Sequence, residues 1–276
     1  MEKITSVQNP KIKNLKRLEK ASERREQNLF LIEGLRETVL AQRAGYEIES
    51  LFVCEEILKR DGEYSLEELL TIDHRPSTIA ISEEIYRTLT YRDSTEGILA
   101  TAKPKKHSLQ ELQSVFTPSP SERAGERLIL VIEAVEKPGN LGAMLRTCDA
   151  AGVDAVIICD AKTDLYNPNV IRSSIGTVFT NQVAVCETSE AIEFLKNNNI
   201  TTYAAELGAE KFYYEQNFKS ATAIVVGTEA TGLSQEWMSA ANERIKIPML
   251  GEIDSLNVSV SAAILLFEAV RQRKTL

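Results

Sequence analysis

The N-terminal segment is polar, but its apolar residues recur at helical spacing. Ile12, Leu15 and Leu18 fall on one helical face, and lysines and arginines fill the other faces. The helix is expected to start at Asn9-Pro10, because Asn caps helices and Pro fits the first turn. The pattern predicts a short basic amphipathic helix that forms an arm over residues 1–25.

Residues 26–102 alternate between short apolar runs and amphipathic stretches, which is typical of a small α/β domain. Gly45 ends the first predicted helix and Ser82 caps the second. The predicted strands are "NLFLIEG" (28–34), "IESLFVC" (48–54), "STIAIS" (77–82) and "GILATAK" (97–103), and the predicted helices are 35–45 and 83–90. Residues 103–126 lose this pattern and end in "TPSPSERAGE", which predicts an exposed linker.

A second alternation of strands and helices fills residues 127–276. Its first strand, "RLILVIEAV" (127–135), is almost wholly apolar, as buried parallel strands are. The predicted helix that follows has apolar residues at i, i+3, i+4 and i+7, namely Leu141, Met144, Leu145 and Cys148. The pattern predicts a doubly wound, mainly parallel α/β domain.

One stretch of this second domain is ambiguous. "IDSLNVSVSAAILLFEAV" (253–270) alternates polar and apolar residues at first, as a half-buried strand does, and then becomes helical in character. The alternation alone favours a strand.

The composition is that of a globular protein without membrane spans. The chain has 276 residues, 43% of them hydrophobic and 26% charged, and no apolar run approaches the roughly 20 residues of a membrane helix. The N-terminus lacks the apolar core of a secretory signal. Four cysteines without CxxC spacing and two histidines in polar surroundings predict reduced thiols in the cytoplasm and no metal site.

Charge is unevenly distributed along the chain. The net charge is −8, yet residues 1–25 carry eight Lys and Arg against three Glu. A basic arm on an acidic body is a recognised arrangement for contact with a polyanion, although a solvated helix face gives the same pattern. The candidate RNA-binding residues of the arm are Lys11, Lys13, Lys16, Arg17, Arg24 and Arg25.

Three predicted strand ends in the second domain carry unusual loops. They are "EAVEKPGNLGAMLR", "VVGTEATGLS" and "IPMLGEIDSLNVS". None contains GxGxxG or a Walker A sequence, and the serines of these loops have no nearby histidine, which disfavours dinucleotide binding, nucleotide hydrolysis and a serine nucleophile. Glycines, main-chain groups and a few polar side chains suit a small neutral or cationic cofactor, with an arginine for a phosphate.

The segments "NLGAMLRTCDAAG", "GTEATGLS" and "IPMLGEIDSLNVSVSAA" resemble, in this order, the three motifs of the SpoU/TrmH family. The members are RNA ribose 2′-O-methyltransferases of the SPOUT superfamily. This resemblance covers residues 127–273. The segment "FLIEGLRETVLAQRAGYEIESLFV" is similar to the RNA substrate-binding domain of the longer members, which has a ribosomal-protein-like α/β fold.

The resemblance implies a catalytic domain over residues 127–276 with a deep trefoil knot, and a substrate-binding domain over residues 26–102. It also implies a homodimer formed through the catalytic domain, with no metal and no membrane. The RNA substrate is expected to be ribosomal RNA of the 23S type rather than transfer RNA. The resemblance places S-adenosylmethionine against Gly227, Ile247, Met249, Gly251 and Leu256.

The motif arginine of the family is Arg146 here, and the resemblance makes it the group that activates the ribose hydroxyl. The polar residues implied around it are Asn140, Ser255, Asn257 and Glu229. A guanidinium is a poor base, so we favour Arg146 as a fork that grips an RNA phosphate. Glu229 is equally suited to capping main-chain NH groups of its loop, and Asn140 to capping a helix.

The third motif also changes the interpretation of residues 253–270. "IDSL" is expected to end a cofactor-binding loop, with Asn257 or Ser255 capping the helix that follows.

Two further points stay open on the sequence alone. Glu136-Lys137 stand where many family members have an Asp before the proline, so the contact made there is undefined. The alternative function is a knotted RNA-binding or ribosome-assembly factor that has lost catalytic turnover.

Overall fold

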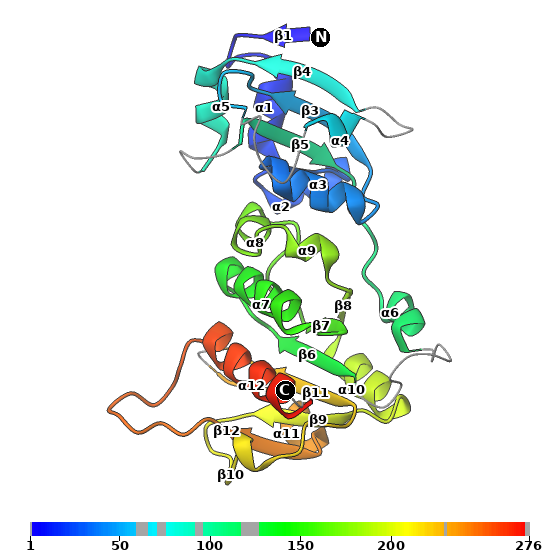
Figure 1. Cartoon of the computed structure of the whole chain (residues 1–276), viewed down its shortest axis with the longest axis vertical. Helices are drawn as coiled ribbons and strands as arrows, with labels where there is room; N and C mark the ends of the chain where they lie inside the picture. The colour runs from blue at the N-terminus through cyan, green and yellow to red at the C-terminus, as the bar shows by residue number, and fades with distance from the viewer. Residues whose placement is uncertain are drawn as a thin grey trace. The chain divides into compact units, whose positions relative to one another are not determined.

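The computed structural model describes residues 2–58, 66–70, 76–91, 96–116, 127–228 and 231–273. The chain divides into two compact units, each with its own sheet (Figure 1). Unit 1 contains residues 1–106 and 164–180, and unit 2 contains residues 107–163 and 181–276. The α/β class predicted from the sequence is confirmed in both units.

Unit 1 is built on a mixed five-stranded sheet of order β1-β4-β3-β5-β2. Strands β1, β4 and β3 are parallel, whereas β5 runs antiparallel to both β3 and β2. The strands are β1 (Glu2–Ile4), β2 (Phe30–Glu33), β3 (Ile48–Val53), β4 (Ser77–Ile81) and β5 (Ile98–Ala102). The sequence predicted all of these strands except β1.

Side chains cap the starts of some helices of unit 1. The Asn9 side chain accepts from Lys11 N at 2.9 Å and Ser82 Oγ accepts from Ile85 N at 3.4 Å. The helices are α1 (Pro10–Arg17), α2 (Ala21–Gln27), α3 (Leu35–Arg43), α4 (Leu66–Leu70), α5 (Glu83–Leu89), α8 (Pro168–Ser173) and α9 (Thr177–Thr180).

The basic helix α1 is not a separate arm. Ile12, Leu15 and Leu18 are buried in the same cluster as Ile79 and Leu99 of the sheet. The amphipathic pattern was therefore interpreted correctly, but its apolar face packs onto unit 1, and only its basic face remains on the surface.

The segment 164–180 also belongs to unit 1, although the sequence placed it in the catalytic domain. Its aromatic residues complete a buried cluster with residues that precede it by more than 100 positions. Tyr166 stacks on Phe30 with ring centroids 4.2 Å apart, and Phe179 meets Tyr46 edge-on at 5.1 Å. The sequence pattern of a strand–helix alternation cannot reveal such a long-range exchange between units.

Arg24 is the polar counterpart of this aromatic cluster. Its side chain is 4% exposed, and its Nε donates to Asp164 Oδ2 at 2.7 Å. Its Nη1 donates to the main-chain oxygens of Leu18 and Glu19, both at 2.8 Å. The assignment of Arg24 as an RNA-binding residue is therefore wrong, because all of its hydrogen-bonding capacity described here is directed into unit 1.

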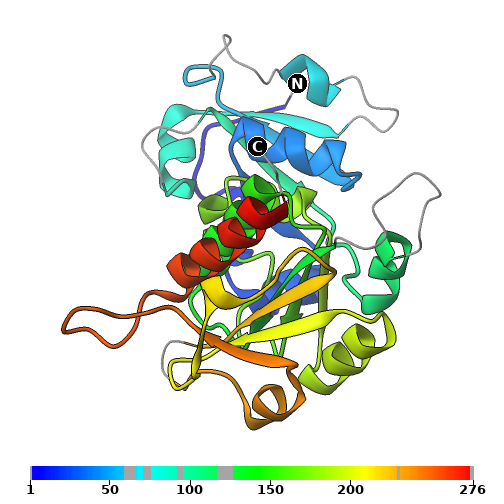
Figure 2. The same cartoon turned by 60° about the horizontal axis from the view of Figure 1, so that its bottom comes forward.

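Unit 2 is built on a seven-stranded sheet of order β10-β12-β9-β11-β6-β7-β8, in which every pairing is parallel. Helices flank this sheet (Figure 2). The strands are β6 (Leu128–Glu133), β7 (Ala155–Cys159), β8 (Val183–Cys186), β9 (Thr201–Ala205), β10 (Lys211–Phe212), β11 (Thr222–Val226) and β12 (Glu243–Lys246). The prediction of a mainly parallel sheet is confirmed.

The helices of unit 2 are α6 (Leu109–Phe116), α7 (Pro138–Ala151), α10 (Thr188–Asn197), α11 (Gln235–Ala240) and α12 (Val258–Arg273), with a 3₁₀ turn η1 (Tyr213–Glu215). Helix α6 lies inside the stretch 103–126 that was predicted to be a linker. Its Leu112 is buried in the core of unit 2, so this part of the stretch is folded. Residues 117–126, which are the "TPSPSERAGE" segment, fall outside the described residues.

Helix α12 resolves the ambiguous stretch in favour of loop followed by helix. Ser259 N donates to Asn257 Oδ1 at 3.0 Å, so Asn257 caps the helix and the strand-like alternation is misleading. The helix packs against α7, β11 and β6. Its buried residues are Val258, Ala262, Leu265, Leu266 and Ala269.

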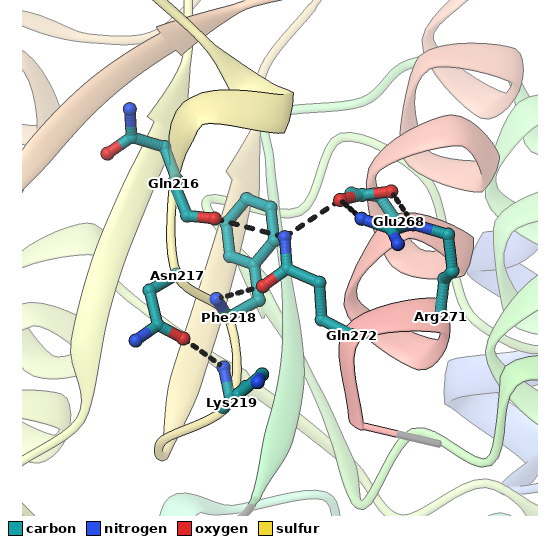
Figure 3. A network of polar contacts seen from close by, with 7 residues as sticks. All are labelled: Gln216, Asn217, Phe218, Lys219, Glu268, Arg271 and Gln272. Atoms are coloured by element: carbon teal, nitrogen blue, oxygen red, sulfur yellow. Dashed lines mark hydrogen bonds and ion pairs between the residues drawn. The ribbon is translucent and has the colours of Figure 1, made fainter. Parts of the chain in front are cut away.

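The end of α12 is held by a polar network with the loop after β10 (Figure 3). Gln272 Nε2 donates to Gln216 O at 3.0 Å, and Phe218 N donates to Gln272 Oε1 at 2.8 Å. Arg273 Nε donates to Phe218 O at 2.7 Å. Side-chain amide and guanidinium groups thus satisfy the main chain of a loop that has no strand partner.

The buried position of Arg24 gives a test of unit 1. Arg24→Ala leaves Asp164 and two main-chain oxygens without their donor, so it should lower the free energy of local unfolding by about 3 kcal/mol. Hydrogen exchange of the β2 amides under increasing denaturant measures this value. Arg25→Ala removes an exposed cation and should change it by less than about 0.5 kcal/mol. Equal protection in the two variants would contradict the structural role of Arg24.

Candidate functional site

A pocket of about 380 Å³ lies in unit 2 at the carboxyl ends of three parallel strands. Strands β9, β11 and β12 contribute its edge, because the sheet order places them side by side. This is where open parallel sheets bind ligands. The pocket is lined by Ala205–Gly208, Val226–Thr228, Thr231, Gly232, Ile245–Ile247, Met249, Ser255, Leu256, Val258, Ser261 and Leu265.

Four of the five predicted cofactor-binding residues line this strand-end pocket, namely Gly227, Ile247, Met249 and Leu256. The fifth, Gly251, does not line it and is exposed. The loops of the second and third motifs, which are far apart in sequence, therefore converge on one cavity. The wall is largely main chain and aliphatic side chain, as the glycine-rich loops predicted.

Gly227 is required by a close approach of two backbone segments. The main chains of Thr228 and Gly232 exchange hydrogen bonds of 3.2 and 3.1 Å, which folds the second motif back on itself. A Cβ at position 227 would lie within 2.6 Å of the Gly232 carbonyl carbon. Any side chain here would force the loop away from the pocket.

The pocket contains two charged residues that sequence reasoning missed. Glu206 Oε2 is buried and has no hydrogen-bond partner among the described residues, although it forms an ion pair with Arg244 Nη1 at 3.6 Å. The Lys246 ammonium lies 5.2 Å from the centre of the Phe212 ring. The only sequence signal for Glu206 is its position directly after β9, since a polar residue at a parallel strand end faces a binding edge.

The Asn140 and Asn257 side chains are brought together although 117 positions separate them. Asn257 Nδ2 donates to Asn140 Oδ1 at 3.2 Å. Asn257 lies between Leu256 and Val258, which both line the pocket, so this amide pair stands at the pocket's rim. Ser255 lines the pocket itself, and its hydroxyl donates to Asp254 Oδ1 at 3.2 Å.

The other predicted catalytic residues are not part of this grouping. Arg146 is exposed on α7 and does not line the pocket. Glu229 lies outside the described residues. Glu136 and Lys137 are exposed just before Pro138, the first residue of α7, and the Lys137 side chain makes no capping bond to the helix.

A second, acidic pocket of about 560 Å³ lies across the second-motif loop, and Thr228, Thr231 and Gly232 line both pockets. Glu133 accepts from Ser234 N at 2.7 Å, which anchors the end of that loop. The Thr188 hydroxyl lies 3.0 Å from Glu133 Oε1 and 2.7 Å from Asp160 Oδ2. The Thr188 hydroxyl thus helps to hold the Glu133 carboxylate, which in turn holds the end of the second-motif loop.

None of the four cysteines lines the strand-end pocket. Burial raises the pKa of Cys148, and a hydrogen bond with Cys186 that favours the protonated thiol, together with burial, raises the pKa of Cys159, so neither is activated as a thiolate. Within the described ranges, no three His, Cys, Asp or Glu side chains are grouped to hold a metal ion. Among the same residues, no helix has both the length and the apolarity to cross a membrane.

Solved structures with this architecture are similar along nearly the whole chain. A crystal structure of an RNA 2′-O ribose methyltransferase is 41% identical with a TM-score of 0.82, and the match covers 98% of this chain and 99% of that one. An AdoMet-bound rRNA methyltransferase from Sinorhizobium meliloti is 25% identical with a TM-score of 0.84, and the match covers 99% of each chain.

Comparison with known sequences also finds rRNA methyltransferases similar to this chain. The 23S rRNA (guanosine(2553)-2′-O)-methyltransferase RlmP of Bacillus subtilis is 32% identical over 97% of this chain and 98% of its own length. The MRM3-like substrate binding domain matches residues 9–100. The SpoU rRNA Methylase family model matches residues 127–267, slightly more than half of the chain. The chain therefore belongs to the SpoU rRNA methylase family.

Proposed function

We propose that the protein transfers a methyl group from S-adenosylmethionine to a ribose 2′-hydroxyl of ribosomal RNA. The observation that carries this proposal is the convergence of the second- and third-motif loops on one pocket, to which the Asn140–Asn257 hydrogen bond joins the first motif. Ribosomal RNA is favoured over transfer RNA, because the full-length relatives named above carry rRNA in their names. The cytoplasm is the proposed compartment, since it keeps the four free thiols reduced.

The pocket fits S-adenosylmethionine by size and by charge. Val226, Ile245 and Leu256 supply apolar surface for an adenine ring, and the glycine-rich loops supply main-chain groups. Glu206 Oε2, which has no hydrogen-bond partner among the described residues, suits the positively charged cofactor or its hydroxyl donors. When bound, the cofactor supplies a methyl group activated by its sulfonium.

The protein's own contribution is positioning rather than strong acid–base chemistry. Asn140, Asn257 and Ser255 are placed to orient the ribose at the rim, and such orientation supplies much of the rate in a displacement reaction. Arg146 has a guanidinium that cannot serve as a base near neutral pH. We assign it to a bidentate grip on an RNA phosphate, with the hydroxyl proton passing to water or a phosphate oxygen.

Two features of the catalytic unit remain part of the proposal. A homodimer is supported by exposed apolar side chains on α12 and on the loop before it, namely Leu250, Ile253, Val260 and Phe267. In such a dimer, Arg146 would face RNA held at the joint interface. The trefoil knot is supported by the path of the chain, which leaves β12 near one sheet edge and returns through α12 to β11 and β6.

Unit 1 is proposed to recognise the RNA substrate. The basic face of α1 keeps Lys11, Lys13, Lys16 and Arg17 at the surface, together with Arg25 of α2. These five residues replace the original set of six, from which Arg24 is removed. The phosphate backbone of RNA is the ligand that such a basic face fits.

Activity is tested on ribosomal and transfer RNA from a strain that lacks the gene. We expect the purified protein to restore one 2′-O-methyl group in ribosomal RNA, detected by mapping of methylation sites, and none in transfer RNA. The alternative, an RNA-binding assembly factor without turnover, predicts no methylation and no heat of S-adenosylmethionine binding in calorimetry, even with RNA present.

The grip of Arg146 is tested by Arg146→Lys. A lysine keeps the charge but cannot form two parallel hydrogen bonds, so kcat/KM for RNA should fall at least about tenfold. The Kd for S-adenosylmethionine should not change, because Arg146 does not line the pocket. Arg271→Lys changes an exposed arginine paired with Glu268 and serves as the control. Near-normal turnover of Arg146→Lys would contradict the bidentate grip.

The role of Glu206 is tested by Glu206→Gln, which keeps the shape but removes the charge. We expect a Kd for S-adenosylmethionine that is raised roughly tenfold or more, since a hydrogen bond to a charged group contributes about 1.5–3 kcal/mol. Glu210→Gln alters an exposed carboxylate outside the pocket and should leave the Kd unchanged. Calorimetry measures both values, and equal affinities would exclude Glu206 as a cofactor contact.

A further inference from the structure

Tyr91 in unit 1 presents an aromatic ring to solvent from a fixed backbone. It follows α5, and its main-chain nitrogen donates to both carboxylate oxygens of Glu33 at 3.3 and 3.2 Å. Its side chain is nevertheless 81% exposed. Because the backbone is anchored to the end of β2 while the ring stays outside the core, the ring contributes little to folding.

One face of this ring is already occupied by a cation. The Arg172 guanidinium lies 4.1 Å from the ring centroid, which is a cation–π contact. Arg172 comes from α8, in the segment 164–180 that joins unit 1 from a distant part of the sequence. Since the ring is mostly exposed despite this contact, its other face is open to a planar ligand.

The stack stands over a pocket of about 220 Å³ with mixed walls. Leu31, Leu89 and Ile171 give it an apolar floor. Asn167, Asn169, Glu19 and Glu33 add hydrogen-bonding side chains around it. Aromatic, guanidinium and amide groups around an apolar floor are the groups that hold an unstacked nucleobase.

The basic face of α1 leads to this pocket. Glu19, two residues after the end of α1, lines the pocket, and Lys16 and Arg17 occupy the last turn of the helix. Both of these cations are exposed. A single strand whose phosphates follow this face would bring a base to the position of Tyr91, because basic grooves with stacking side chains are how proteins hold single-stranded nucleic acid.

We infer that Tyr91 and Arg172 form a binding site for one unstacked base of a single-stranded RNA segment. The base stacks on the open face of Tyr91, and Arg172 holds the ring from behind. This inference rests on the proposed function, because it assumes an RNA substrate. It adds a base-binding site in unit 1, apart from the pocket that holds the cofactor.

The test uses the full chain and a 12-nucleotide single-stranded RNA with one 2-aminopurine, whose fluorescence reports stacking. Tyr91→Ala should raise the Kd about 5- to 150-fold, which corresponds to the 1–3 kcal/mol that one base–aromatic stack contributes. Tyr91→Phe keeps the ring and should bind within about twofold of the unaltered protein. Tyr214→Ala removes a half-exposed tyrosine of unit 2 and should also bind within about twofold of the unaltered protein.

Two further readouts identify the kind of site. A fully paired RNA of equal length should bind the Tyr91→Ala and unaltered proteins alike, because its bases are not available for stacking. The slope of log Kd against log salt should stay the same in Tyr91→Ala, since no phosphate contact is lost.

The inference is overturned if Tyr91→Ala binds the single strand as tightly as the unaltered protein, which would assign the exposed ring to a protein contact instead. It is also overturned if Tyr91→Phe loses as much affinity as Tyr91→Ala, because the ring would then not be the contact. Methylation assays on the same samples distinguish failure of the base-binding site from failure of the proposed methyltransferase function. If the unaltered protein methylates ribosomal RNA and Tyr91→Ala does not raise the Kd for the single strand, only the base site is refuted. If the unaltered protein neither binds nor methylates RNA, both proposals are refuted.

Discussion

The side chain of Asn257 is the contact on which the geometry of the candidate site depends. Its Oδ1 accepts from Ser259 N and so sets the first turn of α12, while its Nδ2 donates to Asn140 on α7. One amide therefore fixes where the last helix begins and ties it to a helix formed more than 100 residues earlier. Ser255 and Leu256 reach the pocket because the chain must arrive at Asn257 in this position. An aspartate would keep the cap but lose the donor, so the two functions require an amide.

Short-range chemistry explains which features the sequence could predict. Caps at Asn9, Ser82 and Asn257 depend on main-chain groups two or three residues away, and the apolar strands of unit 2 are recognised by composition alone. The predictions from sequence failed where a residue's partner lies far away in the chain. Arg24 looked like a surface cation because Asp164, which pairs with it, is 140 positions away in the chain. Glu206 carried no motif, and only the sheet order reveals that the end of β9 faces the pocket.

The segment 164–180 shows why domain boundaries drawn along the sequence differ from the folded units. Its amino-acid pattern is that of the family's catalytic domain, yet Tyr166 and Phe179 pack on Phe30 and Tyr46 of unit 1. Gly176 permits this packing, since its φ of +86° is unfavourable for other residues and a Cβ would lie 2.9 Å from Leu40 Cδ1. Unit 1 is therefore completed only after more than half of the chain is present.

The two units present their candidate ligand contacts in different ways. Unit 2 forms the strand-end pocket mainly from main chain and aliphatic groups, and a position such as Gly227 has room for no side chain. Unit 1 presents its candidate RNA contacts as exposed side chains on helices whose opposite faces maintain the core, as α1 does with Lys16 outside and Leu15 inside. Exposed positions tolerate substitution at little cost in stability. The proposed RNA contacts of unit 1 can therefore change without altering the strand-end pocket, except for Arg172, which lies in the segment 164–180 between two parts of unit 2.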